Sequence, residues 1–224
     1  LLRAFPESGN GIPFAWVNLQ RGLESDETHE QCTAGVGTLV LEFGMLSHLT
    51  GDDRYYNKAS KALFALYELR SSLDLLGNTF DCVTGNWVNT NAGIGAGVDS
   101  YYEYLLKAYV MFGDERYLEM FETVYKAVLQ HLKTGDWYVE ANYDSGSHTH
   151  VHFNSLQAFW PGLQVMYGDL AQAAATQEKF FSLWERYDGL PERFLLSSNS
   201  AHNSEHYYPL RPEFIESTYH LFSA

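Results

Sequence analysis

This sequence has few cationic residues and no long apolar run. Lys and Arg together number 14 against 28 Asp and Glu, which gives a formal net charge of −14 at pH 7. Nucleic acids and anionic membrane surfaces are recognised through clustered Lys and Arg, so the composition argues against both as partners and favours neutral ligands. Because no uninterrupted apolar run is long enough to cross a bilayer, we also predict that the chain has no membrane span.

Cysteine is scarcer still, and we find no glycosylation sequon and no signal-peptide pattern in the sequence. Cys32 and Cys82 are the only two cysteines. They could form one disulfide in an oxidising compartment or remain two buried free thiols. The chain holds no Asn-x-Ser/Thr sequon, which neither shows nor excludes a secretory origin. It begins without Met or a signal-peptide pattern and ends in a helical pattern without a stop signal, so we expect both ends to be cut.

A Gly-Asp pair between two apolar runs occurs three times and organises the rest of the chain. The three pairs are Gly51-Asp52, Gly113-Asp114 and Gly168-Asp169. Glycine can end a helix in the left-handed conformation, and Asp can cap the next helix and suits its positive end. The recurrence therefore predicts helical hairpins, which must stack or close into a ring to bury their apolar sides.

Hydrophobic periodicity predicts three such hairpins and the first helix of a fourth. Their helices span residues 35–49 and 52–69, 97–112 and 114–132, 153–167 and 169–187, and 212–222. Segments 77–88 and 138–152 have the pattern of short β-hairpins, and residues 1–34 are predicted to be irregular. With 224 residues, of which 46% are hydrophobic, the chain suits one domain or part of a larger one. The predicted fold class is all-α, an α/α toroid with long loops on one rim.

Acidic residues lie among the apolar positions of the first helix in two of these pairs. Glu42 has Leu39 and Met45 as helical neighbours, so its carboxylate is expected inside the apolar stripe. Asp99 and Glu103 lie four residues apart on a face that otherwise packs. For Asp99 the simpler explanation is a cap at the helix N-terminus. For Glu42 and Glu103, a functional carboxylate and a merely hydrogen-bonded one are both open.

The fourth helix starts with a second group of acids. Pro212 suits the first helical position, and the helix dipole favours a negative charge at Glu213 in the first turn. Glu213, Glu216, Ser217 and His220 form one polar stripe at helical spacing. A ring of first helices, each turning an acid inward, would make a carboxylate-lined pocket. Such a pocket suits neutral polyols, and paired carboxylates are the groups that hydrolyse glycosides.

Four runs of the sequence are distinctive enough to suggest a family. The most specific are Asp-Ser-Tyr-Tyr-Glu-Tyr-Leu-Leu-Lys at 99–107 and Leu-Arg-Pro-Glu at 210–213, and the others span 33–43 and 155–162. Together and in this order they resemble class I α-1,2-mannosidases, glycoside hydrolase family 47, over nearly the whole chain. Within that family the match is closest to the ER degradation-enhancing α-mannosidase-like branch.

The resemblance implies an (α/α)7 barrel whose inner helices direct acids into a mannose site, with Ca²⁺ at the barrel base. The chain, residues 1–224, would be a single domain that forms roughly half of this barrel and an internal part of the catalytic domain. By the same resemblance Glu213 matches the proposed general base, and Glu103 matches an acid of the substrate pocket that we count with the catalytic positions. The matching substrate-binding positions are Arg211, Glu216, Glu42 and Asp99.

The resemblance also implies an inverting reaction. One carboxylic acid protonates the leaving oxygen while a carboxylate on the opposite face of the sugar activates water. In this family the acid comes from an inner helix upstream of residue 1, and a calcium-binding Thr lies downstream of residue 224. We therefore assign no metal ligand within this chain, and we expect the chain alone to be inactive.

One position of the presumed site departs from the family pattern. The residue before Ser155 is usually an Asp that is implicated in activating water, whereas this chain has Asn154. An amide cannot take up a proton, although it can hold a water or a sugar hydroxyl. His152 likewise stands where an arginine is expected. Lost or restricted hydrolysis is therefore an alternative for this chain.

Three histidines alternate with other residues just before Asn154. In a strand, His148, His150 and His152 would point to one face, which is a pattern that metal sites use. No Cys or carboxylate in the sequence completes an obvious set of ligands, and the segment falls where the family has a variable loop. We therefore favour an exposed polar loop over a metal site.

Two functions from different classes remain. The first is an α-1,2-mannosidase that trims high-mannose N-glycans of misfolded glycoproteins in the lumen of the endoplasmic reticulum, marking them for degradation. The second is a mannose-binding pseudoenzyme that recognises such glycoproteins without cutting them, and Asn154 is its main support. The intact Glu213 and Arg211 favour the enzyme. Resemblance to the degradation branch further implies a partner of the protein disulfide isomerase type.

Overall fold

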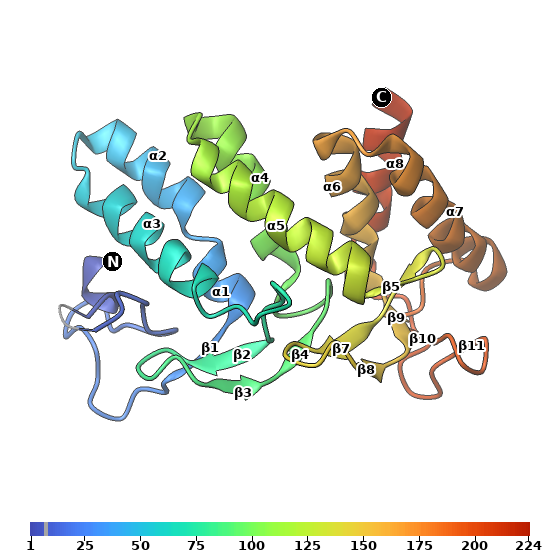
Figure 1. Ribbon diagram of the computed structural model, residues 1–224, viewed down its shortest axis with the longest axis horizontal. Coiled ribbons are helices and arrows are strands. Elements are labelled where there is room, and N and C mark those ends of the chain that lie inside the picture. The colour runs from blue at the N-terminus through green and yellow to red at the C-terminus, as the bar shows by residue number, and fades with distance from the viewer. Residues whose placement is uncertain (7–8) are drawn as a thin grey trace.

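The computed structural model describes residues 1–6 and 9–224 and consists of helical hairpins arranged side by side (Figure 1). The helices are α1 (Thr33–Gly37), α2 (Val40–Thr50), α3 (Arg54–Tyr67), α4 (Asp99–Phe112), α5 (Glu115–His131), α6 (Trp160–Tyr167), α7 (Leu170–Tyr187) and α8 (Glu213–Ser223), with the 3-10 helices η1 (Leu2–Ala4) and η2 (Ser155–Phe159). The pairs α2/α3, α4/α5 and α6/α7 pack as hairpins, and α8 packs against α6 and α7. The predicted hairpins are confirmed.

The three Gly-Asp turns form as predicted. Gly51, Gly113 and Gly168 each end a helix in the left-handed conformation, with φ of 70°, 68° and 94°. The predicted Asp cap is confirmed at Asp114, whose side chain accepts from the Arg116 N–H. It is wrong at Asp169, which makes no capping bond and instead accepts a hydrogen bond from a tyrosine of the neighbouring hairpin.

In the part of the chain that the structure describes, eleven short strands lie at the other end of the molecule, opposite the Gly-Asp turns (Figure 1). One sheet has the order β1 (Glu30–Cys32), β2 (Thr79–Asp81), β3 (Trp87–Asn89); a second β4 (Asn91–Ala92), β7 (Glu140–Asn142), β8 (His148–His150); a third β11 (Ser200–Ala201), β10 (Arg193–Leu195), β9 (His152–Asn154); and β5 (Lys133–Thr134) pairs with β6 (Trp137–Tyr138). All pairings are antiparallel. Both predicted β-hairpins, within 77–88 and 138–152, are confirmed.

Two predicted helices are shorter than their apolar patterns suggest. The helix expected over 35–49 is broken between α1 and α2, where Thr38 and Leu39 leave the helical ladder. The helix expected over 153–167 contains α6 only from Trp160 onward. Its first part is strand β9 and then η2, because Phe153 pairs with Phe194 of β10 instead of continuing a helix.

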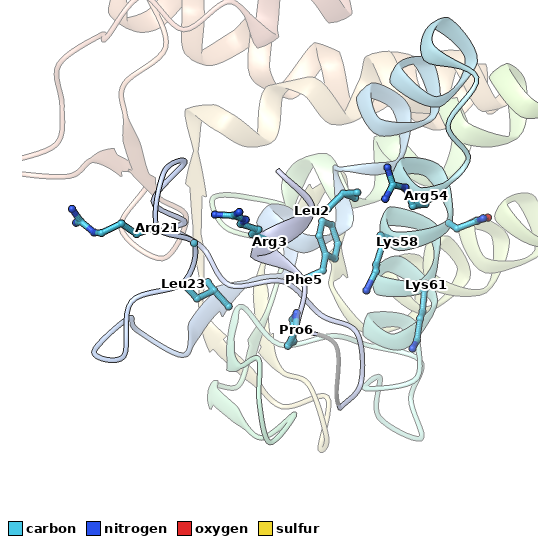
Figure 2. Close-up of a pocket in the computed structure, with 11 residues that line it drawn as sticks. Leu2, Arg3, Phe5, Pro6, Arg21, Leu23, Arg54, Lys58 and Lys61 are labelled. Atoms are coloured by element: carbon cyan, nitrogen blue, oxygen red, sulfur yellow. The ribbon is translucent and has the colours of Figure 1, made fainter.

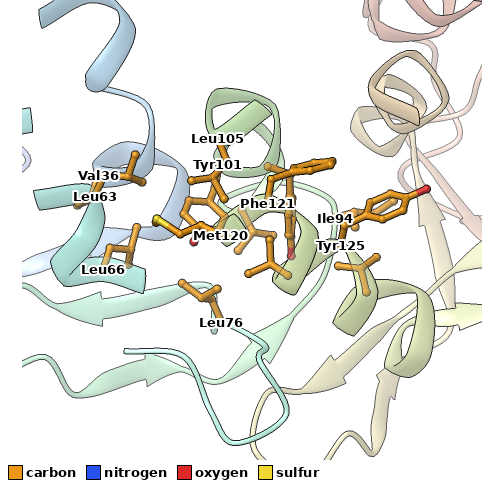
Figure 3. Close-up of a cluster of buried hydrophobic side chains, with 14 of the residues drawn as sticks. Val36, Leu63, Leu66, Leu76, Ile94, Tyr101, Leu105, Met120, Phe121 and Tyr125 are labelled. Carbon is orange, nitrogen blue, oxygen red and sulfur yellow. The ribbon is translucent and has the colours of Figure 1, made fainter. Parts of the chain in front are cut away.

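The main core lies between the hairpins and the strands (Figure 3). Outer helices α3 and α5 contribute Leu63, Leu66 and Phe121, which pack with Tyr101 and Leu105 of α4. These side chains are essentially inaccessible to solvent. Burial of each large apolar side chain is worth about 1.5–3 kcal/mol, so this cluster is what holds the first two hairpins together.

A second, smaller apolar cluster supports the C-terminal part of the chain. It joins β9, α7, β10 and α8 and consists of Phe153, Ala158, Phe180, Leu183, Leu190, Phe194 and Phe214. Phe214 at the start of α8 stacks on Trp184 of α7. Trp160 of α6 packs in the main core against Tyr102 of α4 and Tyr125 of α5. The start of α8 is therefore fixed relative to the rest of the fold by buried aromatic packing.

The two cysteines are free thiols, Cys82 buried and Cys32 half-buried. Cys32 pairs with Thr79 in the β1–β2 ladder, whereas the Cys82 N–H donates to the His29 carbonyl. His29, the partner of Cys82, lies three residues before Cys32 along the chain, which puts the two thiols on opposite faces of the sheet. Of the two alternatives, the structure therefore has the free thiols, since bridged residues need Cβ atoms that face one another.

None of the helices in the described residues is long and apolar enough to span a membrane.

Candidate functional site

Two helices that are distant in sequence bring the predicted acids to one end of the molecule. Asp99 and Glu103 lie in the first turns of α4, and Glu213 and Glu216 lie in the first turn of α8. Both helices begin at the end where the strands lie (Figure 1). Burial raises the pKa values of both Glu103 and Glu213, and the nearby charges of Glu216 and Asp99 raise both values further. The structure therefore gathers these four carboxylates into one cluster, which we call the acidic cluster.

Glu213 is the member of the acidic cluster with the least satisfied carboxylate. Its Oε2 is buried and has no hydrogen-bond partner among the residues that the structure describes. Burial raises the pKa of Glu213, with further increases from Glu216 and Asp99, while its own backbone N–H and Arg211 act in the opposite direction. A buried carboxylate oxygen without a partner is costly, so it is a strong candidate for contact with a ligand or water.

Glu103 and Asp99 line the same cluster from α4. The Glu103 side chain is only 18% exposed and accepts a hydrogen bond from Lys107 Nζ at 3.1 Å. Burial raises the pKa of Glu103, and Lys107 partly offsets this. Asp99 Oδ1 accepts from the Ser100 N–H at 2.7 Å. Asp99 is the first residue of α4 and not its cap, because Val98 occupies the cap position, so the simple capping explanation is wrong.

Glu42 is not buried as its sequence neighbours suggested. Helix α2 buries Val40, Gly44 and Ser47, and the opposite face that carries Glu42 and Met45 is exposed. Glu42 Oε1 accepts a hydrogen bond of 2.7 Å from Tyr104 of α4. This bond ties the exposed face of α2 to α4, and within the described residues no hydrogen bond or ion pair joins Glu42 to the four acids of the cluster.

The polar stripe predicted on α8 divides into two kinds of residue. Glu216 is exposed and lies 3.8 Å from His220. Ser217 is fully buried: its Oγ donates to the Ala158 carbonyl at 2.6 Å and accepts from the Gly162 N–H at 2.9 Å. Ser217 therefore fastens α8 to η2 and α6, and only the acids of the stripe face the cluster.

Arg211 is held by a carboxylate that the sequence analysis did not single out. Glu192 accepts from Arg211 Nη2 at 2.6 Å and from Nε at 2.8 Å. The same side chain accepts from Ser155 Oγ at 2.6 Å. Glu192 lies in an irregular segment, where periodicity gives no indication of burial. Its position directly after Pro191 was the one local sign that it could be important.

Asn154 has a structural role as the N-terminal cap of η2. Its Oδ1 accepts from the Leu156 N–H at 3.0 Å, and its own N–H donates to Gln157 Oε1 at 3.3 Å. This reciprocal arrangement is a capping box at the start of η2. An Asp would make the same cap, so the amide is not required by the fold at this position.

The histidine segment before Asn154 is only partly an exposed loop. His148 and His150 are exposed on β8, as predicted, but His152 on β9 is only 8% exposed, and for this residue the prediction is wrong. His150 Nδ1 lies 3.1 Å and His152 Nε2 lies 3.7 Å from the Glu140 carboxylate. Burial lowers the pKa of His152 to about 4, helped by the positive charge of Arg193. His152 is therefore a neutral imidazole at physiological pH.

A cavity of about 770 Å³ lies elsewhere (Figure 2). It is formed between the N-terminal segment and α3, and its lining includes Arg3, Arg54, Lys58 and Lys61. None of the predicted site residues reaches it. The acidic cluster lies apart from this cavity, at the first turns of α4 and α8.

The fold and the acidic cluster together define a helical-hairpin protein with the carboxylates of a glycoside hydrolase. A family model, "Glycosyl hydrolase family 47", matches residues 1–224, and the chain belongs to this family. It is 52% identical to "Alpha-mannosidase I MNS5" of Arabidopsis thaliana over 97% of the chain and 38% of that protein. It is 42% identical to human "ER degradation-enhancing alpha-mannosidase-like protein 2" over 100% of the chain and 39% of that protein.

The same fold is present in a solved structure. An alpha-1,2-mannosidase from Trichoderma reesei superimposes with a TM-score of 0.79 at 21% identity, over 99% of this chain and 53% of that one. The helical hairpins with small sheets are therefore the fold of family 47 mannosidases. The chain spans 38% and 39% of the two curated relatives named above. Closure into a complete barrel is therefore a proposal about the whole protein.

Proposed function

We propose that this chain forms one side of the sugar pocket of an inverting α-1,2-mannosidase. The observation that carries the proposal is Glu213, whose buried Oε2 lacks a partner inside a cluster of carboxylates in a family 47 chain. In the proposed reaction Glu213 takes a proton from the attacking water, and a carboxylic acid outside this chain protonates the leaving oxygen. Arg211, Asp99, Glu103, Glu216 and Glu42 bind the sugar through hydrogen bonds to its hydroxyls.

The proposed substrate is a high-mannose N-glycan on a misfolded glycoprotein in the lumen of the endoplasmic reticulum. Support comes from the printed names of relatives, which include ER degradation-enhancing alpha-mannosidase-like proteins of human and fission yeast. The acidic character of the chain suits a neutral ligand such as a sugar. A partner of the protein disulfide isomerase type belongs to the same proposal.

Calcium is proposed as the cofactor of the whole protein. The carboxylates of Glu103, Glu213 and Glu216 are hard oxygen donors of the kind that calcium prefers, either directly or through water. Within the described residues no three such side chains come together in a coordinating group, so these acids fit an outer shell of water-bridged donors. A bound calcium ion would polarise sugar hydroxyls and offset the negative charge of the cluster.

A mannose-binding protein without hydrolysis is the second candidate, and Asn154 is the observation that favours it. Its Oδ1 is already used by the cap of η2, and an amide cannot accept a proton from water. Hydrolysis would then depend on Glu213 without help from this position.

Mannose release from a high-mannose glycan by the full-length protein tests both candidates. We expect slow release by wild type, a loss of at least about a hundredfold in Glu213→Gln, and equal or faster release by Asn154→Asp. Glu24→Gln, which changes an exposed carboxylate paired with Arg21, is the control and should behave as wild type. Glycan binding without any release by wild type would establish the second candidate instead.

A further inference from the structure

Glu192 is a buried acid that the proposed reaction does not use. It is 8% exposed and is fixed through its backbone at both ends. Its N–H donates to the Tyr207 carbonyl at 2.9 Å, and its carbonyl accepts from the Ser155 N–H at 3.1 Å. The side chain therefore leaves a backbone that has little freedom to move.

Both carboxylate oxygens of Glu192 are engaged. Oε1 accepts from Arg211 Nη2, and Oε2 accepts from Arg211 Nε and from Ser155 Oγ. The hydrogen bonds from Arg211, followed by that from Ser155, lower the pKa of Glu192 despite its burial. A bidentate arginine–carboxylate pair of this kind fixes the plane of the guanidinium as well as its position.

These contacts join three separate segments of the candidate site. Ser155 directly follows Asn154, and Arg211 lies two residues before Glu213. Leu210, which precedes Arg211, has φ of 58° although it is not a glycine, and its side chain is 78% exposed. Such a conformation persists only where surrounding contacts determine it, and the Glu192 pair is the contact adjacent to it.

The pair also decides what Arg211 can do for the acidic cluster. Its Nε and one Nη2 hydrogen are committed to Glu192, so the donors left for a ligand are on Nη1 and the far side of Nη2. Its side chain is 34% exposed, which leaves these donors accessible. Glu192 balances the charge of Arg211. Arg211 therefore offers the acidic cluster oriented hydrogen-bond donors and little net positive charge.

We propose that Glu192 is a positioning residue of the mannose site, which holds Arg211 in place as a hydrogen-bond donor and keeps it from pairing with the acidic cluster. This inference rests on the proposed function for its substrate. Without Glu192, Arg211 would turn toward Glu213 and Asp99, the two acids that already respond to its charge. The groups that face Glu213 are then Arg211, Glu216 and Asp99, with Glu103 and Lys107 beyond them.

The test is the pH profile of mannose release by the full-length Glu192→Gln protein. We expect kcat to fall by about tenfold to a hundredfold, because a misplaced donor no longer meets the transition state. We also expect the acid limb of kcat/KM to move to lower pH by about 0.5–1 unit, because a released Arg211 favours ionised Glu213. A purely structural role would lower Tm and total activity without moving that limb, and this result would overturn the proposal.

Two further variants make the assignment to Arg211 specific. Arg211→Lys cannot make the bidentate pair, so adding Glu192→Gln to it should cost little more than Arg211→Lys alone. Fully additive losses would contradict a role through Arg211. If Glu192→Gln does not fold, Ser155→Ala removes one of the three side-chain contacts of Glu192, and a smaller shift in the same direction is expected. An unchanged Ser155→Ala profile with unchanged kcat would also overturn the proposal.

Binding of a mannose-configured iminosugar separates this proposal from the proposed function. If wild type binds the iminosugar but releases no mannose, the enzyme hypothesis fails while the role of Glu192 is still measured. In that case Glu192→Gln should bind about tenfold more weakly, and the control Glu24→Gln should bind as wild type does. If wild type neither binds nor releases mannose, both proposals are overturned. If Glu192→Gln binds and reacts as wild type does, only the positioning role is overturned.

Discussion

At the scale of single residues, the fold holds Glu213 where its negative charge is disfavoured. Its folded pKa is raised by burial and neighbouring acids, whereas in the unfolded chain it is ordinary. Below the unfolded pKa both states bind the proton and the penalty is absent. As pH rises through the folded pKa the folded state must ionise this group, so stability is lost.

Glu213→Gln should therefore be more stable than wild type at neutral pH. We expect a rise in Tm of about 1–3 °C near pH 7 that disappears as the pH falls to about 4. Thermal unfolding of both full-length proteins across this range measures the difference, with the surface variant Glu24→Gln as a control. A gain that grows toward acid pH would contradict the assigned direction of the pKa shift.

Site residues could be predicted from the sequence where helical periodicity shows which face of the helix they occupy. Glu103 and Glu213 lie on regular helices next to apolar positions, so their side of the helix followed from spacing. Glu42 obeys the same rule but lies on a helix that is apolar on both sides, so the pattern could not tell which face packs. Glu192 lies outside any regular element, and only the three-dimensional pairing with Arg211 identifies it.

At the scale of elements, the helix ends at the Gly-Asp turns depend on backbone conformation alone. Gly113 has φ of 68°, and a Cβ placed there would meet no atom within 4 Å. Gly113→Ala should cost about 1 kcal/mol because alanine is strained in the left-handed region. Gly113→Asn should cost less, because Asn tolerates this region. The midpoint of urea unfolding measures both, and equal costs would show that the left-handed conformation is not the cause.

A buried hydroxyl adds to the apolar packing that attaches α8. Ser217→Ala removes the donor to the Ala158 carbonyl and leaves the Gly162 N–H buried without its acceptor. We expect a loss of about 1–3 kcal/mol in unfolding free energy. Ser182→Ala, on the exposed side of α7, is the matched control and should change stability by less than about 0.5 kcal/mol. Equal effects of the two variants would contradict the tie between α8 and η2.

The elements themselves were predictable where pattern and cap chemistry agree. All three hairpins follow from apolar periodicity ended by Gly, and the hairpin of β2 and β3 follows from alternation around a Thr-Gly-Asn turn. The segment 153–159 could not be predicted as strand and 3-10 helix. Its apolar residues suit either structure, and the choice depends on pairing with β10, which lies about forty residues later.

At the scale of the whole molecule, the first helices of the three hairpins carry exposed apolar side chains. The exposed residues include several on the first helices of the hairpins, namely Met45, Leu49, Val110, Met111 and Met166. Neighbouring apolar exposure of this kind marks a surface that another part of a protein or a partner covers. The chain spans 38–39% of the two curated relatives named above, and in the proposed barrel the rest of the protein would cover these side chains.

Residues 1–224 produced alone should therefore behave differently from the full-length protein. We expect the isolated chain to bind a dye specific for apolar surface, to self-associate with concentration, and to release no mannose, because hairpins that lack neighbours leave their inner sides in water. Dye fluorescence and sedimentation of the two proteins at equal concentration measure this. Replacing Leu49 and Val110 by Gln in the isolated chain should reduce both signals, since these two side chains are 74% and 70% exposed. A monomeric isolated chain that binds no dye would mean that these helix faces need no cover, and the proposed closure into a barrel would lose its physical basis.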